Sequence, residues 1–398
     1  MRVLNRVQRL IALLLVAAIL PHVSNAATGG RVFSSSQSPS SQDRPVNLAA
    51  RFARLRRGVN LSHWFSQAAN YSKAHLETHT TAQDIALIKS MGFDHVRFPI
   101  EPAPLLSETR DPSILNSTYL QYVDNALDMI LAAGLTVVVD VHPSDEFKLR
   151  MNRDERNIEA FGKFWHAFAS HLSRRDPEFV FLEVINEPMV EDGYRWSGIQ
   201  AKLIATIRAA APKHTIVAGG HRWSGLGELL FLEPYSDPNV IYNFHFYEPF
   251  AFTHQGATWA GPHLPFYKNV PYPSSPLAVK PVLDTVLDEP ARYNLLRYGE
   301  DNWNAQRIER ELDAAASWAA KHRVYITCNE FGVFRRFAKT EDRIAWLHDI
   351  RLAFEKFGIG WTMWDYAGGF AVINKTNGQA QKEPELLKAL GLMANTTN

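Results

Sequence analysis

Eight β-rich runs alternate with helical patterns along this 398-residue chain, and this alternation constrains the fold more than any other feature. Several runs are apolar throughout and rich in β-branched residues, as expected of parallel strands buried on both faces. Eight successive β-then-α units favour a closed (β/α)₈ barrel, an α/β fold, over an open doubly wound sheet. The expected strands are 57–61, 95–98, 136–141, 180–185, 215–218, 240–247, 324–328 and 360–364.

Apolar residues at helical spacing fill the gaps between these strands. No glycine-rich GxGxxG loop follows the first strand, which argues against a dinucleotide site, and we expect no cofactor. No second linker interrupts the chain after about residue 51, so residues 51–398 are predicted to form one catalytic domain. The clearest helices are expected at 82–91, 118–133, 306–322 and 342–357.

The start of the chain carries an export pattern. Residues 1–26 combine arginines, an apolar stretch and small residues before a cleavage site, which predicts a signal peptide. Residues 27–50 are expected to be a flexible leader, rich in Ser, Pro and Gln. The apolar stretch is too short to span a bilayer, so we expect a secreted protein, extracellular or periplasmic, without membrane association after cleavage. An uncleaved anchor is the alternative.

Charge and cysteine content exclude several classes of protein. The chain has 42 basic and 41 acidic residues, a formal net charge of +1, which argues against a nucleic-acid partner. Cys328 is the single cysteine, so no intrachain disulfide can form, and a buried inert thiol is expected there. Ten tryptophans fit either a large core or a cleft that stacks on sugar rings. We expect a monomer.

Polar and aromatic residues gather where the predicted strands end, and in barrel enzymes the site lies at that end. Two glutamates, on the fourth and seventh strands, are expected to face each other across the barrel. Paired carboxylates suit glycosidic cleavage, because one can protonate the leaving oxygen while the other attacks the anomeric carbon. The strand-end residues are Arg97, His142, Asn186, Glu187, His245, Tyr247, Glu330 and Trp364.

Taken as a set, these positions resemble glycoside hydrolase family 5, the cellulase family of retaining barrel glycosidases. The fourth-strand signature reads LEVINEP at 182–188, and the resemblance runs from about 57 to 370. The other hallmark positions fall on Arg97 in HVRFP, His142 in VVVDVHP, the pair His245 and Tyr247, Glu330 in CNEFG and Trp364 in WTMWDYAGGF.

The resemblance implies a double displacement. Glu330 would be the nucleophile, and Glu187 would protonate the leaving oxygen and then activate the water that releases the glycosyl-enzyme. The supporting roles that it implies are holding Glu330 (Arg97, Tyr247), supporting Glu187 (His245), binding the 2-hydroxyl (Asn186), lining the reacting subsite (His142, Trp364) and adding further sugar contacts (Asn60, His63, Trp64, Trp259).

A long connection and one departure from the family pattern bear on the substrate. More than fifty residues without clear structure follow Tyr247, and we expect them to wall one side of the substrate cleft. Many cellulases of the family carry two consecutive histidines after the third strand, whereas Pro143 follows His142 here. We predict an endo-β-1,4-glucanase acting on β-glucan.

Several alternatives stay open at this point. The same residues would serve a hydrolase of mannan, xyloglucan or β-1,3-glucan, and a barrel that binds β-glycans without turnover is possible. A metal-dependent hydrolase would use His63, His142 and His245, but the chain has no HExxH motif or aspartate-rich cluster, and we expect no metal.

Overall fold

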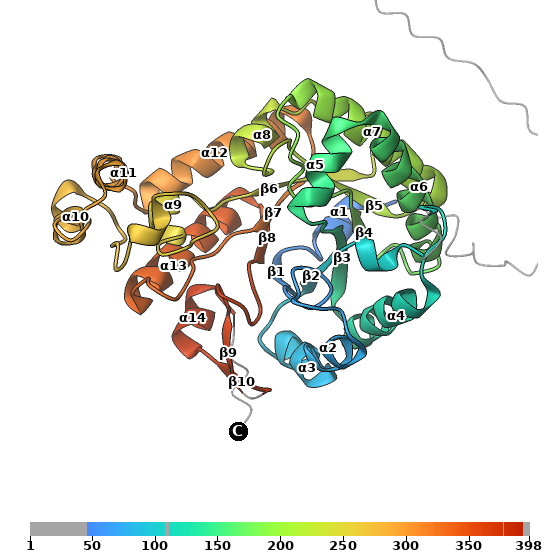
Figure 1. Cartoon of the computed structure of the whole chain (residues 1–398), viewed down its shortest axis with the longest axis horizontal. Helices are drawn as coiled ribbons and strands as arrows, with labels where there is room; N and C mark the ends of the chain where they lie inside the picture. Colours follow the sequence, from blue (N-terminus) through green and yellow to red (C-terminus); the bar gives the residue numbers. More distant parts are fainter. Residues whose placement is uncertain (1–45, 108–110, 377, 393–398) are drawn as a thin grey trace, which may run out of the picture. The chain divides into compact units, whose positions relative to one another are not determined.

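The computed structural model describes residues 46–107, 111–376 and 378–392. Eight parallel strands close into a barrel in chain order, with β8 paired to β1 (Figure 1), so the expected (β/α)₈ fold is confirmed. The strands are β1 Arg57–Asn60, β2 His95–Ile100, β3 Thr136–Val141, β4 Val180–Glu183, β5 Thr215–Gly219, β6 Val240–His245, β7 Ile326–Glu330 and β8 Gly360–Met363.

Strand alternation divides the barrel interior into an apolar layer and a polar layer. Side chains two residues apart on a strand share a face. On β3 the inward Val138 is followed by Asp140, and on β4 the inward Phe181 is followed by Glu183. The first of each pair joins an apolar cluster inside the barrel, and the second lies nearer the carboxyl end. The register therefore brings buried charges to the end where a site is expected.

Helices surround the barrel, and their apolar faces pack in the main core. The helices between Val46 and Leu232 are α1 Leu48–Phe52, α2 Lys73–Thr78, α3 Ala82–Ser90, η2 Ala103–Leu105, α4 Ser117–Ala132, α5 Asp145–Arg153, α6 Glu155–Leu172, α7 Gly193–Ala210 and α8 Leu226–Phe231. Those that follow are α9 Phe250–Thr253, η3 Leu264–Phe266, α10 Pro276–Leu283, α11 Glu289–Glu300, α12 Ala305–His322, α13 Thr340–Phe357 and α14 Pro384–Ala389. A hairpin of β9 Ile373–Thr376 and β10 Gln379–Lys382 follows the barrel.

Local capping explains why several helices begin and end where they do. Thr81 and Asp84 form a reciprocal capping box at the start of α3. The side chain of Asn116 accepts two backbone hydrogen bonds at the start of α4. Gly134 adopts φ of 71° just after α4 ends, which confirms the expected stop. All four predicted helices are present, with ends that differ by at most two residues.

The connection after β6 is more ordered than the sequence predicted. It carries α9, η3, α10 and α11, so the expectation of a segment without clear structure is wrong. The composition misled because prolines stand at the starts of α10 and α11, where they are compatible with a helix. In Figure 1, α10 and α11 lie at the edge of the domain, away from the strands, whereas α9 lies nearer the barrel.

The export signal expected at 1–26 lies outside the described residues, as does most of the leader. The last leader residues are described, and α1 already begins at Leu48, with Arg51 buried against the barrel. Helix α1 therefore begins three residues before the expected start of the catalytic domain at 51. In the described part of the chain, no helix has the length and apolar character needed to cross a bilayer.

Candidate active site

The two candidate glutamates meet at the carboxyl end of the barrel. Glu330 is the last residue of β7, and Glu187 follows β4 in the Asn-Glu-Pro turn. Each offers a carboxylate oxygen, and these oxygens and a ring nitrogen of His245 all lie within 4.8 Å of one another. Glu187 has a φ of 43°, a left-handed conformation that non-glycine residues rarely adopt and that often marks functional positions.

Arg97 anchors the floor of this site. Its buried guanidinium donates from Nη1 to Oε1 of Glu330 over 2.8 Å. Its Nε and Nη2 each bind a carboxylate oxygen of Glu183 at 2.9 Å, and Nη2 also lies 2.8 Å from Oδ2 of Asp140. Three carboxylates thus surround one cation. Burial, opposed by Arg97, raises the pKa of Asp140 to about 7, and burial likewise raises the pKa of Glu183.

Hydrogen bonds fix the orientations of His142 and Asn186 beside Arg97. His142 Nδ1 lies 2.8 Å from Oδ2 of Asp140, and the ring lies nearly parallel to that of Trp364, with centroids 5.8 Å apart. Asn186 accepts from Arg97 through Oδ1 at 2.8 Å, and its Nδ2 lies 3.2 Å from His142 Nε2. Burial lowers the pKa of His142 to about 3, so its ring is neutral at ordinary pH and Nε2 can accept this hydrogen bond.

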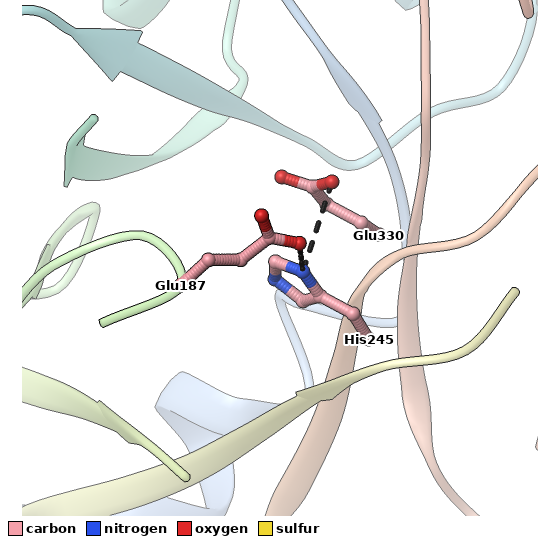
Figure 2. Close-up of side chains that lie close together, drawn as sticks. All are labelled: Glu187, His245 and Glu330. Atoms are coloured by element: carbon pink, nitrogen blue, oxygen red, sulfur yellow. Dashed lines mark hydrogen bonds and ion pairs between the residues drawn. The ribbon is translucent and has the colours of Figure 1, made fainter. Parts of the chain in front are cut away.

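His245 connects the two glutamates (Figure 2). Its Nδ1 lies 2.8 Å from Oε1 of Glu187 and 3.7 Å from Oε2 of Glu330. Burial opposes charge on His245, but the negative charge of Glu330 and the hydrogen bond to Glu187 outweigh burial and raise its pKa. Burial would raise the pKa of Glu187, but the hydrogen bond and charge of His245 outweigh burial and lower it. These opposite shifts favour a protonated His245 beside an ionised Glu187.

The second oxygen of Glu330 is also fixed. The hydroxyl of Tyr247 donates to Oε2 over 3.0 Å, so Glu330 receives one donor on each oxygen. Cys328 is buried, its thiol donates to the carbonyl of Glu330, and burial raises its pKa. The expectation of a buried, unreactive thiol agrees with this placement.

Of the four remaining residues that were expected to contact sugar, two are buried. Asn60 is fully buried: its Oδ1 accepts from Arg97 and its Nδ2 donates to the carbonyl of Asn329 over 2.9 Å, so it supports the site from below. Trp64 is 2% exposed and packs against Phe65 and Phe98, so it belongs to the core. Neither can reach a sugar, because packing and hydrogen bonds occupy both side chains.

The other two stay accessible. His63 is partly exposed, has a φ of 58°, and lies beside Gly368 in the loop after β8. Trp259 is 63% exposed and packs edge-on against Phe334, with ring centroids 4.9 Å apart. Phe334 packs on Phe370, which packs on Tyr247, so an aromatic series links Trp259 to the site.

Sequence reasoning missed several residues of this region. Asp140 and Glu183 were treated as parts of apolar strands, although a charge inside a continuously buried run was an available signal of an internal partner. Asn329 was also missed, and its Nδ2 donates to Glu183 over 2.7 Å. Trp223 follows β5 and is 56% exposed at the rim, but nothing in the sequence distinguished it from a packed tryptophan.

The histidines proposed for a metal do not converge. Both ring nitrogens of His142 have side-chain partners, and His63 Nδ1 lies 3.2 Å from the carbonyl of Gln67. Among the described residues, the group of potential ligands that does converge is Glu187, His245 and Glu330. The metal site considered from the sequence, built on His63, His142 and His245, is therefore wrong.

A parallel eight-stranded barrel with two carboxylates close together at its carboxyl end fits a glycoside hydrolase. The family model for cellulase, glycosyl hydrolase family 5, matches residues 57–369. The chain therefore belongs to glycoside hydrolase family 5, which confirms the resemblance seen in the sequence.

Several relatives and solved structures share this architecture. Endoglucanase C of Acetivibrio thermocellus is 28% identical over 316 residues, which cover 78% of this chain and 90% of that protein. Endoglucanase 3 of Fibrobacter succinogenes is 29% identical over 357 residues, 85% of this chain and 53% of that protein. The crystal structure of an endoglucanase from Thermotoga maritima superposes with a TM-score of 0.72 at 25% identity, covering 87% of this chain and all of that one.

Proposed function

We propose that this protein is an exported endo-β-1,4-glucanase that cleaves β-glucan with retention of configuration. The spacing of Glu187 and Glu330 carries the retaining mechanism, because a carboxylate oxygen of one lies within 4.8 Å of a carboxylate oxygen of the other. Retaining glycosidases place the two carboxyl groups about 5–5.5 Å apart, whereas inverting ones leave about 6.5–9.5 Å for a water molecule. The named relatives and structural neighbours support a glucan as substrate.

Glu330 is the nucleophile in this proposal. Arg97 and Tyr247 each hold one carboxylate oxygen, so the side chain is fixed before substrate arrives. Attack on the anomeric carbon forms a covalent glycosyl-enzyme and breaks the bond to the leaving oxygen. The Tyr247 hydroxyl can keep its hydrogen bond to Glu330 while the carboxylate loses its negative charge in forming the bond to the sugar.

Glu187 is the general acid and then the general base. In the free enzyme its proton is shared with His245 across the 2.8 Å contact. A sugar that covers the site removes water from Glu187, which favours the neutral acid and moves the proton onto the carboxyl group. Glu187 donates that proton to the leaving oxygen, then takes one from the water that attacks the glycosyl-enzyme.

The neighbouring residues fit binding roles around the reacting sugar. Arg97 and His142 fix the orientation of the Asn186 amide, so its second N–H can serve the 2-hydroxyl. Trp364, stacked beside His142, supplies an apolar wall. Trp223 and Trp259 are exposed on the loops after β5 and β6, where they can stack on further sugars.

Export and size complete the proposal. Residues 1–26 would be removed as a signal peptide, leaving the leader 27–50 and a catalytic domain at 51–398 that acts as a monomer, without cofactor, metal or membrane partner. N-terminal sequencing of the protein recovered outside an expressing cell tests the cleavage, and light scattering tests the monomer. A mature chain that still begins at Met1 would contradict the signal peptide.

The substrate is tested by hydrolysis of soluble β-glycans. Carboxymethyl-cellulose, mixed-linkage glucan, xyloglucan, mannan and laminarin should be compared by reducing ends and viscosity. Rapid viscosity loss on carboxymethyl-cellulose or mixed-linkage glucan supports the endoglucanase. Activity confined to mannan would favour a mannanase with the same mechanism; the Thermotoga maritima structure in complex with mannotriose, 26% identical, makes this the second candidate. No release from any glycan would contradict the enzyme.

A further inference from the structure

Three aromatic side chains are exposed beyond Glu187, on the segments that follow β4 and β5. Tyr194 is 79% exposed, Trp223 56% and Phe231 42%. Tyr194 lies in the first turn of α7, and Phe231 ends α8. The helices lie next to each other in Figure 1, and the Tyr194–Phe231 contact confirms that they meet at this rim.

Tyr194 and Phe231 form a built pair rather than two isolated side chains. Their rings meet edge to face, with centroids 5.0 Å apart, and His221 packs on the other side of Phe231 at 5.4 Å. A Cβ at Gly193 would lie 2.4 Å from the Phe231 ring, so glycine at this position lets the ring pack against the backbone. One broad face of Tyr194 remains open to solvent, as its exposure requires.

Backbone contacts tie this pair to the acid side of the site. The backbone N–H of His245 donates to the carbonyl of Ser224 over 2.7 Å, and that of Arg222 donates to the carbonyl of Val190 over 3.2 Å. The segments after β4 and β5 are therefore joined to each other and to His245. Arg222 and Ser224, on either side of Trp223, both have positive φ, so the backbone is held in a strained turn where Trp223 projects.

The surroundings of the pair fit a sugar better than an apolar partner. Arg222 is paired with Glu228, and His221 is partly exposed, so polar groups border the aromatic faces. Sugar rings present apolar C–H faces with hydroxyls at the edge, which suits an aromatic face bordered by donors and acceptors. A purely apolar partner would cover these polar groups without offering them hydrogen bonds.

We propose that Tyr194 and Phe231 form a distal subsite for a β-linked glucan chain on the leaving-group side, beyond the sugar at Trp223. The inference rests on the proposed function, because it takes the side of Glu187 as the leaving-group side. A chain long enough to reach Tyr194 gains a stacking contact that a short oligosaccharide cannot make. Chain-length preference, and with it attack within a polymer, is the expected consequence.

The test compares Tyr194→Ala with the unchanged enzyme on cellotriose and cellohexaose. We expect kcat/KM for cellohexaose to fall about 5-fold, the worth of one aromatic contact, and that for cellotriose to stay the same. Tyr194→Phe keeps the ring and should retain the cellohexaose value. Tyr293→Ala serves as the matched control, because Tyr293 is 63% exposed but lies on α11.

The outcomes separate this inference from the function on which it rests. An unchanged enzyme that cleaves neither oligosaccharide contradicts the proposed glucanase. If the unchanged enzyme cleaves both, equal losses on the two substrates, or no loss on cellohexaose, overturn the distal subsite. If Tyr194→Ala unfolds at the same temperature as the unchanged enzyme, its loss of kcat/KM arises from binding rather than from folding.

Discussion

His245 Nδ1 lies 2.8 Å from Oε1 of Glu187, so a hydrogen bond joins the histidine to the candidate acid, and a proton held by the pair lies on this contact. A histidine whose pKa is raised by two carboxylates holds that proton to higher pH than a carboxyl group alone would. The pair, rather than either residue, is therefore expected to set the pH above which the acid is lost.

Replacing His245 by Asn should move the basic limb of the kcat/KM profile to lower pH. Asn can still donate to Glu187 but cannot store the proton, so protonation then depends on the carboxyl group itself. The pH dependence of kcat/KM from about pH 4 to 9 measures the shift. An unchanged basic limb would show that His245 does not hold the proton of the acid.

Glu330→Ala should lower kcat by at least about 10³-fold, because the covalent step loses its nucleophile. Reducing-end release from the best soluble glycan measures the loss. Glu289→Ala is the matched control, since the Glu289 side chain is 86% exposed on α11. Near-normal turnover by Glu330→Ala would place the nucleophile elsewhere.

Glu187→Ala should distinguish substrates by their leaving groups. An aryl glycoside with a good leaving group needs little protonation, so its glycosylation should suffer far less than cleavage of the polymer. Parallel kinetics on an activated aryl cellobioside and on carboxymethyl-cellulose provide the measurement. Equal losses on both would remove Glu187 from the role of acid.

The strand ends that carry the site were predictable because each lies at the end of an apolar run, and the run fixes where the strand stops. Glu330 lies two residues after VYITC and ends β7, and His245 directly follows VIYNF and ends β6, so both strands stop within two residues of the expected ends. The direction of a side chain was harder to predict. Asn60 pairs in register with Arg97, so both point into the barrel, and only the closed sheet shows that Asn60 has no face left for a sugar.

Residues joined by long-range contacts were the least predictable. Asp140 and Glu183 could be identified as part of the site only from the folded barrel, which brings both to Arg97. The role of a buried carboxylate depends on its charged partner, and the sequence does not show that partner. The prediction for the connection after β6 was wrong for another reason. Its prolines suggested a loop, although a proline is tolerated in the first turn of a helix.

Acid should destabilise the fold through buried neutral histidines. His214 is 1% exposed, and burial lowers its pKa from 6.5 to about 4. Between these values the unfolded chain binds a proton that the folded protein does not, so stability falls as pH drops below about 6.5. His214→Leu should narrow the difference in unfolding free energy between pH 7 and pH 4.5 by roughly 2–3 kcal/mol. Urea unfolding at the two pH values gives that difference; an unchanged gap would contradict the shift.

Two tryptophans expected to contact sugar should behave in opposite ways. Trp64 is buried, and its indole N–H donates to the carbonyl of Leu76 over 2.8 Å. Trp64→Ala therefore leaves a cavity and an unpaired carbonyl, and should lower the free energy of unfolding by about 3–5 kcal/mol. Trp259 is exposed and contacts Phe334 edge-on, so Trp259→Ala should change the free energy of unfolding by less than about 1 kcal/mol.

The same two variants should separate binding from folding in kinetics. Trp259→Ala removes a stacking face and should raise KM for soluble glucan several-fold. Trp64→Ala, assayed below its own unfolding temperature, should leave KM nearly unchanged, because the lost ring never meets substrate. Trp259→Phe and Trp64→Phe are the matched controls, since each keeps an aromatic ring. The opposite result would be a higher KM for folded Trp64→Ala and an unchanged KM for Trp259→Ala. It would mean that Trp64 contacts the sugar and that its side chain is not buried when substrate is bound.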